Sequence, residues 1–180
     1  MYGQRGNFKS NQYNLPTGSN CDFDTLYQPT GVALDKRGQV YIVDSYNYRV
    51  LVFVGNSTDA TRVYGQATFV TRSNGVNPAY FALPSSVAVD SKDNVFVADV
   101  DASRVMMFPA ASTTASVVFG QWNSMYSAIV NNGGISAYSL YKPTAVVVDA
   151  ENNLYVADTW NQRVLFYPQN FVVATKVWGQ

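Results

Sequence analysis

One 28-residue segment occurs three times in the chain, and the three copies align without a gap. The copies are residues 26–53 (LYQPTGVALDKRGQVYIVDSYNYRVLVF), 81–108 (FALPSSVAVDSKDNVFVADVDASRVMMF) and 140–167 (LYKPTAVVVDAENNLYVADTWNQRVLFY). Each copy is followed by a shorter run that ends in an aromatic residue, Gly and Gln, at 64–66, 119–121 and 178–180. A fourth such ending, Tyr2-Gly3-Gln4, lies at the start. A chain of this kind folds by repeating one structural unit.

Each copy predicts short β-strands. In the first copy, small and apolar residues alternate over 31–35, and β-branched and aromatic residues are frequent in 40–43 and 49–53. Residues 62–65 supply a fourth strand. The turn after the first strand has Gly38, Asp93 and Asn152 at the same position, which are residue types that tolerate positive φ. No segment has helical spacing of its apolar residues, so the sequence predicts no helix.

The spacing of the endings indicates the architecture. Gly65 and Gly120 are 55 residues apart, and Gly120 and Gly179 are 59 apart. Four-stranded units that repeat in this way are typical of β-propeller blades. We therefore predict an all-β fold, a β-propeller segment of three four-stranded antiparallel blades in one partial domain. The predicted boundaries are 1–66 for blade 1 with a long N-terminal loop, 67–121 for blade 2 and 122–180 for blade 3.

Three long loops rich in Gly, Asn and Ser precede the blades, at 5–25, 67–80 and 122–139. Because they occur at the same position of the repeat, we expect them to lie on one face of the molecule, where binding residues usually concentrate. Their aromatic residues are candidates for a contact surface, or alternatively pack between blades. These residues are Tyr13, Tyr80, Trp122, Tyr126 and Tyr138.

The repeated pattern L-x-x-P-x-x-V-x-x-D, an apolar run ending in Asp, and then R-V-x-x-(F/Y) resembles the NHL repeat, a blade unit of β-propellers. The aromatic-Gly-Gln endings and the N-N-G-G-x-S-A spacer at 131–137 are similar to tandem NHL proteins of microbial origin. The resemblance implies about six blades, whereas this chain has three. Three outcomes are open: half of a six-bladed ring completed by a second copy, part of a longer array, or an open fibre of copies stacked end to end.

A carboxylate and a guanidinium recur in every copy. Asp44, Asp99 and Asp158 end the second strands, and Arg49, Arg104 and Arg163 follow five residues later. The six residues could form a charged ring for a ligand. The alternative is a structural clamp, in which the Asp accepts turn N–H groups and the Arg forks onto it through two nitrogens. Because a catalytic group is needed once and a clamp is needed in every blade, the recurrence favours the clamp. Asp35, Asp90 and Asp149 are predicted to form turns.

The composition argues against an enzyme. The chain has no His, the commonest general base and metal ligand, and its one Cys, Cys21, has no intrachain disulfide partner. We expect Cys21 to fill space in a loop; the alternative is a bridge between chains. Among NHL-like enzymes, the resemblance points to amidating lyases with His ligands for zinc and to lactonase-like propellers with Glu, Asp and Asn around calcium. Glu151 is the only Glu here, and no compact loop suits calcium. We therefore expect no catalytic residues, metal or cofactor, with a degenerate lyase or hydrolase as the least favoured alternative.

The charge and hydropathy of the chain limit the kinds of partner that it can bind. Lys and Arg number 12, as do Asp and Glu, so the net charge is zero. Some NHL propellers of animals bind RNA through a basic face, but here the Arg residues outside the clamps are few: Arg5, Arg37, Arg62 and Arg72. We expect no nucleic-acid binding and, without an apolar run of ~20 residues, no membrane insertion. The 13 Tyr and the uncharged polar residues suggest an extracellular or cell-surface setting, although residues 1–25 contain no signal-peptide core.

These observations predict a non-catalytic NHL-repeat scaffold for protein interaction or self-assembly, with itself or another protein as partner. The alternative is a ligand- or carbohydrate-binding propeller that uses the long inter-blade loops. Asn56-Ser57-Thr58 fits the N-glycosylation acceptor pattern and makes Asn56 a candidate modification site in a secreted protein.

Overall fold

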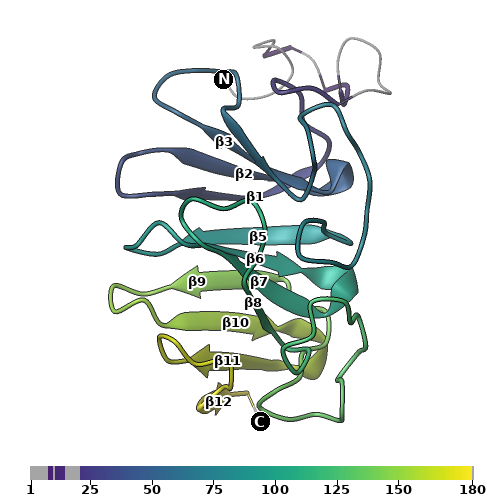
Figure 1. Ribbon diagram of the computed structural model, residues 1–180, viewed down its shortest axis with the longest axis vertical. Coiled ribbons are helices and arrows are strands. Elements are labelled where there is room, and N and C mark those ends of the chain that lie inside the picture. The colour runs from purple at the N-terminus through teal and green to yellow at the C-terminus, as the bar shows by residue number, and fades with distance from the viewer. Residues whose placement is uncertain (1–7, 10, 15–20, 180) are drawn as a thin grey trace.

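The computed structural model describes residues 8–9, 11–14 and 21–179 and contains three four-stranded antiparallel sheets, stacked as successive blades (Figure 1). Blade 1 consists of β1 (Pro29–Leu34), β2 (Val40–Asp44), β3 (Arg49–Phe53) and β4 (Arg62–Tyr64). Blade 2 consists of β5 (Pro84–Val89), β6 (Val95–Asp99), β7 (Arg104–Phe108) and β8 (Val117–Phe119). Blade 3 consists of β9 (Ala145–Val148), β10 (Leu154–Asp158), β11 (Arg163–Tyr167) and β12 (Lys176–Trp178). The prediction of an all-β partial propeller is confirmed.

The first hairpin of each blade follows from its turn residues. Gly38, Asp93 and Asn152 have φ values of 76°, 65° and 64°, as the residue types predict. The preceding aspartate then accepts two backbone N–H groups of the turn. Asp35 accepts those of Arg37 and Gln39, both at 2.9 Å, and Asp90 and Asp149 do the same in their turns.

The second and third strands of each blade are joined by one turn of 3-10 helix, which the sequence did not predict. The three helices are η2 (Ser45–Asn47), η3 (Val100–Ala102) and η4 (Thr159–Asn161). A single turn is too short to create a periodic apolar pattern, and 3-10 turns are common as connectors. The residue that ends each helix, such as Tyr48 at φ 55°, is left-handed and turns the chain into the third strand.

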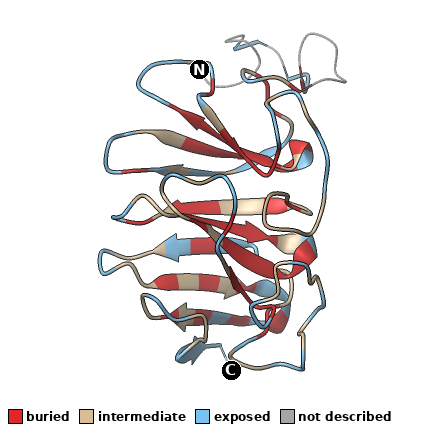
Figure 2. Cartoon of the chain, in the orientation of Figure 1, coloured by how far each residue is buried: buried red, intermediate tan, exposed pale blue. Residues whose placement is uncertain are grey.

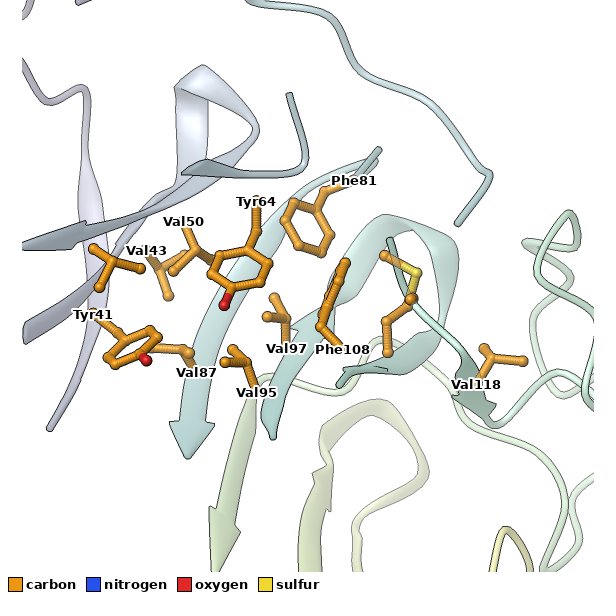
Figure 3. Close-up of a cluster of buried hydrophobic side chains, with 13 residues drawn as sticks. Tyr41, Val43, Val50, Tyr64, Phe81, Val87, Val95, Val97, Phe108 and Val118 are labelled. Atoms are coloured by element: carbon orange, nitrogen blue, oxygen red, sulfur yellow. The ribbon is translucent and has the colours of Figure 1, made fainter. Parts of the chain in front are cut away.

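The hydrophobic core lies between the blades. Tyr41, Val43 and Tyr64 of blade 1 pack against Phe81 and Phe108 of blade 2 (Figure 3). A second cluster joins blades 2 and 3, so blade 2 packs against a neighbour on each side. Most residues of its strands are accordingly buried (Figure 2). Because side chains alternate along a strand, each blade contributes one face to each neighbour.

The Gly of each aromatic-Gly-Gln ending makes room for the next blade. A Cβ on Gly65 would lie 2.1 Å from the ring of Phe81, and one on Gly120 would lie 2.6 Å from the side chain of Leu140. Phe81 and Leu140 are the first residues of the second and third repeats. The first apolar residue of the following repeat therefore packs directly against the glycine of each ending.

The long loops 67–80 and 122–139 run along one side of the molecule, together with the 3-10 turns (right side of Figure 1). The tight turns of the β1–β2, β5–β6 and β9–β10 hairpins lie on the opposite side. The long loops thus lie on one face, as their common position in the repeat predicts.

Candidate functional site

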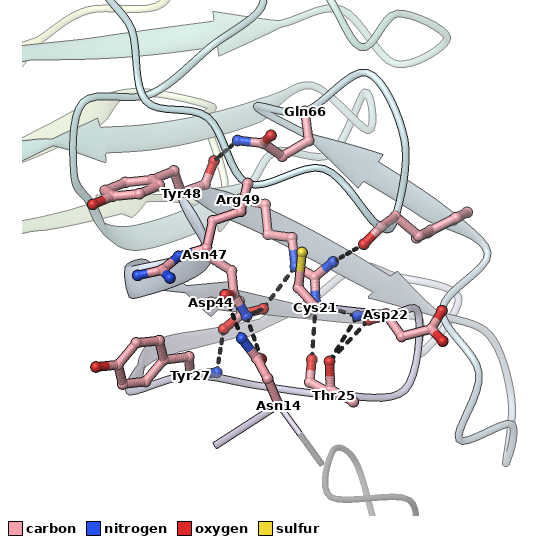
Figure 4. Close-up of polar contacts among 12 residues, drawn as sticks. Asn14, Cys21, Asp22, Thr25, Tyr27, Asp44, Asn47, Tyr48, Arg49 and Gln66 are labelled. Atoms are coloured by element: carbon pink, nitrogen blue, oxygen red, sulfur yellow. Dashed lines mark hydrogen bonds and ion pairs between the residues drawn. The ribbon is translucent and has the colours of Figure 1, made fainter. Parts of the chain in front are cut away.

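Asp44 and Arg49 form a fully buried ion pair, with Arg49 Nε 2.7 Å from Asp44 Oδ2 (Figure 4). The other carboxylate oxygen accepts the backbone N–H of Tyr27 at 2.6 Å, and the amide of Asn47 donates to Oδ2 at 2.9 Å. Burial raises the pKa of the Asp44 carboxyl, and the positive charge of Arg49 opposes that shift. The carboxylate is saturated by its own blade and is not available to a ligand.

The geometry of Arg49 differs from the predicted two-nitrogen fork. Its Nη2 donates to the carbonyls of Asp22 and Thr25 at 2.8 and 2.9 Å, and its Nη1 donates to the carbonyl of Phe69. Only Nε binds the carboxylate, because the two terminal nitrogens face loop backbone. Arg49 therefore connects the second strand of its blade to the loop before the blade and to the loop after it.

Blade 2 repeats this arrangement. Arg104 Nε lies 2.9 Å from Asp99 Oδ2, while its terminal nitrogens reach the carbonyl of Tyr80 at 3.0 Å and that of Met125 at 2.7 Å. Tyr80 belongs to the preceding loop and Met125 to the following one. The pairs in blades 1 and 2 are thus complete.

The clamp of blade 3 is incomplete within the described part of the chain. Arg163 Nε lies 2.7 Å from Asp158 Oδ2, and Nη2 donates to the carbonyls of Ser136 and Ser139. Among the described residues, no carbonyl takes the place that Phe69 and Met125 occupy at Nη1. The guanidinium instead borders a hollow of about 250 Å³ that Ser136, Thr175 and Val177 also line. In blades 1 and 2, the carbonyl that binds Nη1 belongs to the segment that follows the aromatic-Gly-Gln ending.

A pair of asparagines accompanies the clamp in blades 1 and 3. Asn14 and Asn47 exchange two amide hydrogen bonds of 2.9 and 2.8 Å, and Asn131 and Asn161 do so at 3.0 and 2.7 Å. Sequence reasoning missed these residues. The signal was the 3-10 turn position, which is Asn in two repeats and Ala102 in the other.

The outer face of blade 3 exposes the side chains that blade 1 buries. Tyr155, Phe166 and Trp178 form a cluster of rings with centroids 5.1 to 6.4 Å apart. Trp178 is 47% exposed, whereas the equivalent Tyr64 of blade 1 is 0% exposed because blade 2 covers it. The equivalent faces of blades 1 and 2 are each covered by the blade that follows.

Blade 1, at the opposite end of the described structure, has no described blade packed on its other face. Val32 of β1 is 69% exposed, while the equivalent Val87 and Val146 are 5% and 4% exposed because each lies against the preceding blade. A hydroxyl hydrogen bond links the inner strands in the same direction, from Thr30 to the carbonyl of Ser85 at 2.8 Å and from Ser85 to that of Thr144 at 3.0 Å. The chain therefore carries both halves of one repeated contact, one at each end.

The predicted loop aromatics lie in more than one cluster. Trp122 stacks on Tyr138 at 4.3 Å, and Tyr13 stacks on Tyr27 at 4.2 Å. Tyr80 is half-buried beside the clamp of blade 2, and Tyr126 is 75% exposed.

Cys21 and Asn56 differ in accessibility. Cys21 is buried, and its thiol donates to the carbonyl of Thr71 at 3.1 Å, as expected of a side chain that fills space. Burial raises the pKa of this thiol. Asn56 is exposed at the turn between β3 and β4, so it is accessible to modification.

The cations considered for RNA are engaged locally. Arg37 pairs with Asp35 and Asp93, and Arg72 donates to the carbonyl of Tyr46 at 2.8 Å. Arg62 reaches across to the carbonyl of Ala110 at 3.2 Å, and Arg5 lies outside the described residues. In the part of the chain that the structure describes, no three His, Cys, Asp or Glu residues gather in a way that could hold a metal ion. No helix among those residues has the length and apolarity of a membrane span.

The NHL repeat family model matches residues 26–53 and 140–166. Both segments are therefore similar to NHL repeats. The copy at 81–108 lies outside the matched ranges, yet its blade has the same strand order and the same buried clamp as the two blades that flank it. Among its departures from them are Phe81 in place of the leading Leu and Ala102 in place of the Asn beside the clamp.

Solved structures share this fold at low sequence identity. A nidogen/laminin complex matches at a TM-score of 0.59 and 18% identity, over 88% of this chain and 50% of that one. A catalytically inactive virginiamycin B lyase from Staphylococcus aureus with quinupristin matches at 0.56 and 10%, over 84% and 41%. A structural genomics protein of unknown function from Bacteroides thetaiotaomicron matches at 0.63 and 15%, over 80% and 36%. The chain spans half or less of these structures. A comparison with curated proteins gave no match.

Proposed function

We propose that this chain is a non-catalytic NHL scaffold that associates head to tail with further copies of itself. The outer face of blade 3 in one copy receives blade 1 of the next copy, in the geometry by which blade 2 receives blade 3. The observation that carries the proposal is the pair of unfilled ends: Val32 at one end, and Trp178 with Arg163 at the other.

The internal interfaces specify what the contact supplies. Thr144 occupies the position of Thr30 and Ser85, so its hydroxyl is placed to donate to the carbonyl of Thr30 in the next copy. Val147 of β9 is exposed on the same face and would meet Val32 and Leu34 of that copy. Burial of these aliphatic side chains and of the Trp178 ring supplies the driving force, since removing apolar surface from water stabilises by ~25 cal/mol per Å².

A head-to-tail contact uses different surfaces on the two partners. Such a heterologous interface forms a closed ring if the rotation between copies closes and a filament if it does not. Two copies would give a ring with the blade number that NHL propellers usually have. More than two copies in register would give a fibre.

The scaffold role fits the chemistry of the repeated carboxylates. Each clamp aspartate is paired with a buried Arg, and the hairpin aspartates bind backbone N–H groups of their turns. None of these groups faces an open site with a nucleophile or a base. We place the scaffold outside the cell or on its surface, where Asn56 would accept a glycan.

Sedimentation velocity over a hundredfold range of concentration, with electron microscopy of the same samples, tests this function. We expect a mass that rises with concentration, and rings or filaments whose repeat is one chain. A monomer at every concentration would refute self-association. Binding of a different protein in its place would leave a scaffold but not a self-assembling one.

The long loops support a second candidate, glycan binding. Trp122 and Tyr138 stack and are both partly exposed, and Tyr126 lies in the same loop. Exposed aromatic rings of this kind offer flat apolar surface with polar edges to a sugar. A glycan array probed with the wild-type chain and with Trp122→Ala tests this candidate. Signals that are absent, or equal for both proteins, would eliminate it.

A further inference from the structure

In blades 1 and 2, the loop residue whose carbonyl binds the clamp arginine also buries its own side chain. Arg49 Nη1 donates to the carbonyl of Phe69, and Arg104 Nη1 donates to that of Met125. Phe69 and Met125 are both half-buried, and each packs against a core cluster that contains residues of the blade before it. The loop after a blade therefore contributes a backbone acceptor and an apolar side chain from one position.

The clusters against which Phe69 and Met125 pack have equivalent residues in blade 3. They include a leucine or methionine of the third strand, an alanine before the fourth strand and a valine within it. In blade order these residues are Leu51, Ala60 and Val63; Met106, Ala115 and Val118; and Leu165, Ala174 and Val177.

The three residues of blade 3 line the hollow of about 250 Å³ beside Arg163. Val177 is 49% exposed there, whereas Val63 and Val118 are 9% and 2% exposed. The hollow is thus the place in blade 3 that corresponds to the one filled by Phe69 in blade 1 and by Met125 in blade 2.

One hydrogen bond that occurs in all three long loops fixes their register. A backbone N–H of the loop donates to the carbonyl of the residue that begins the following repeat. The donors are Asn14, Gly75 and Asn131, and the acceptors are Leu26, Phe81 and Leu140. The three donors are therefore equivalent positions.

Counting back from these donors identifies Phe8 as the third member of the set. Phe69 and Met125 each precede the donor of their loop by six residues, and Phe8 precedes Asn14 by six. The aromatic-Gly-Gln endings give the same result, because Phe8 follows Gln4 by four positions as Met125 follows Gln121. An apolar residue occupies this position in all three loops.

Phe8 is not buried as its two equivalents are. Its side chain is 85% exposed. It lies in the segment that leads into blade 1, and no described blade precedes blade 1. Blades 1 and 3 lie at opposite ends of the described structure, with blade 2 between them (Figure 1). The exposed phenylalanine and the unfilled hollow therefore belong to opposite ends of the chain.

We propose that Phe8 of one copy fills the hollow in blade 3 of the neighbouring copy, where its carbonyl accepts a hydrogen bond from Arg163 Nη1. This inference rests on the proposed head-to-tail association and assigns the N-terminal loop a part in it. The neighbouring copy would supply to blade 3 what the loops of the chain supply to blades 1 and 2. The volume suits a phenyl ring, because a cavity of ~150 Å³ already holds benzene.

Two variants that are each blocked at one end isolate a single head-to-tail contact for the test. Val147→Glu charges the outer face of blade 3, and Val32→Glu charges the blade 1 end, both at exposed residues. In the dimer of these two variants, Phe8 comes from the Val147→Glu copy and the hollow comes from the Val32→Glu copy. Sedimentation velocity of the mixture measures the dissociation constant of this dimer.

Phe8→Ala is then introduced into one copy at a time. In the Val147→Glu copy it should raise the dissociation constant about tenfold, which corresponds to ~1.4 kcal/mol and is within the range for burying a phenylalanine side chain. In the Val32→Glu copy the same substitution should change it less than about twofold, as expected of an exposed residue away from the contact. Phe8→Met in the Val147→Glu copy should stay within about threefold of the unsubstituted pair, because Met125 fills the equivalent place in blade 2.

The two placements of Phe8→Ala separate this inference from the proposed function. A loss that is equal for both placements, or no loss in either, would overturn the insertion of Phe8 and leave head-to-tail association standing. A pair that does not associate even with Phe8 in both copies would overturn the association and the insertion together. Circular dichroism of each variant should show an unchanged fold, since Phe8 is exposed in the monomer.

Discussion

Asn131 and Asn161 exchange two hydrogen bonds of 3.0 and 2.7 Å although they are 30 residues apart in the sequence. Asn161 also donates to Asp158 at 2.9 Å, so the pair joins the loop before blade 3 to the buried clamp. Blade 2 has smaller residues at both positions of this arrangement. Ala102 takes the place of Asn161, and Gly75 takes that of Asn131, since its N–H donates to the carbonyl of Phe81 as that of Asn131 donates to the carbonyl of Leu140. The two positions thus behave as one unit within a single chain.

This pairing predicts non-additive substitutions. Asn161→Ala removes both bonds to Asn131 and one to Asp158, so it should lower the free energy of unfolding by about 2 kcal/mol. Adding Asn131→Gly should cost less than about 0.5 kcal/mol more, because its amide has already lost its partner and its φ of 45° suits Gly. Urea denaturation of the two single variants and the double variant measures the coupling. Costs that simply add would show that the pair does not act as a unit.

The three clamps predict a ranking of arginine substitutions. Lys in place of Arg104 keeps the charge but cannot bind Asp99 and the carbonyls of Tyr80 and Met125 together, so Arg104→Lys should destabilise the monomer by about 3 kcal/mol. Arg163→Lys should cost only about 1–2 kcal/mol, because the described chain supplies no carbonyl for its Nη1. Thermal or urea unfolding at low protein concentration checks the order. A larger loss for Arg163 than for Arg104 would contradict the incomplete clamp.

The glycines of the aromatic-Gly-Gln endings predict a similar difference between blades 2 and 3. An Ala at Gly120 would meet both a left-handed backbone (φ 90°) and the side chain of Leu140 at 2.6 Å. Gly179 also has a positive φ, but the close atom is its own blade's backbone, the carbonyl of Gln162 at 2.7 Å, and no side chain from a following blade. Gly120→Ala should therefore lower the unfolding midpoint of the monomer more than Gly179→Ala does. Equal shifts in differential scanning fluorimetry would contradict the inference that no side chain of a following blade packs against Gly179.

Tyr41 predicts a loss of stability in alkali. Burial raises the pKa of Tyr41 to about 12 in the folded chain, whereas an unfolded tyrosine ionises near pH ~10. The stabilisation from keeping this phenol neutral is fully present below pH ~10 and is lost as the pH rises through the folded pKa. Burial also raises the pKa of Tyr167, which adds to the same trend.

The free energy of unfolding should therefore fall between pH ~10 and ~12, and Tyr41→Phe should flatten part of that fall. Urea denaturation from pH 9 upward measures the effect in both proteins. Identical pH profiles for wild type and Tyr41→Phe would show that Tyr41 does not titrate as described.

The fold could be predicted from the sequence because each blade repeats the same local signals. Gly38, Asp93 and Asn152 set the first turn, and Asp44 and its equivalents mark the end of the second strand. These features are local, so three copies in register were sufficient evidence. The 3-10 turns could not be predicted because three residues carry no periodicity.

The surfaces were less predictable because they depend on contacts between blades. Asp44 and Arg49 were identified as a pair from their recurrence, but the loop carbonyls bound by the guanidinium belong to backbone and leave no mark in the sequence. The exposed state of Val32 and Trp178 likewise depends on which neighbour each blade has.

The most direct test of head-to-tail association blocks each end separately. Val147→Glu charges the outer face of blade 3, and Val32→Glu charges the opposite end; both residues are exposed, so folding should be retained. Val70→Glu, at an exposed site in the loop between blades 1 and 2, is the matched control and should associate like the wild type.

The measurement is the mass by analytical ultracentrifugation of each blocked variant alone and of the two mixed in equal amounts. Each variant alone should be monomeric. Because each variant keeps one unmodified face, the mixture should contain a dimer of one copy of each variant, held by a single contact. The two remaining faces of that dimer are blocked, so it can neither close into a ring nor grow into a filament. A Val32→Glu variant that assembles like the wild type, or a mixture that stays monomeric, would contradict head-to-tail association through these two ends.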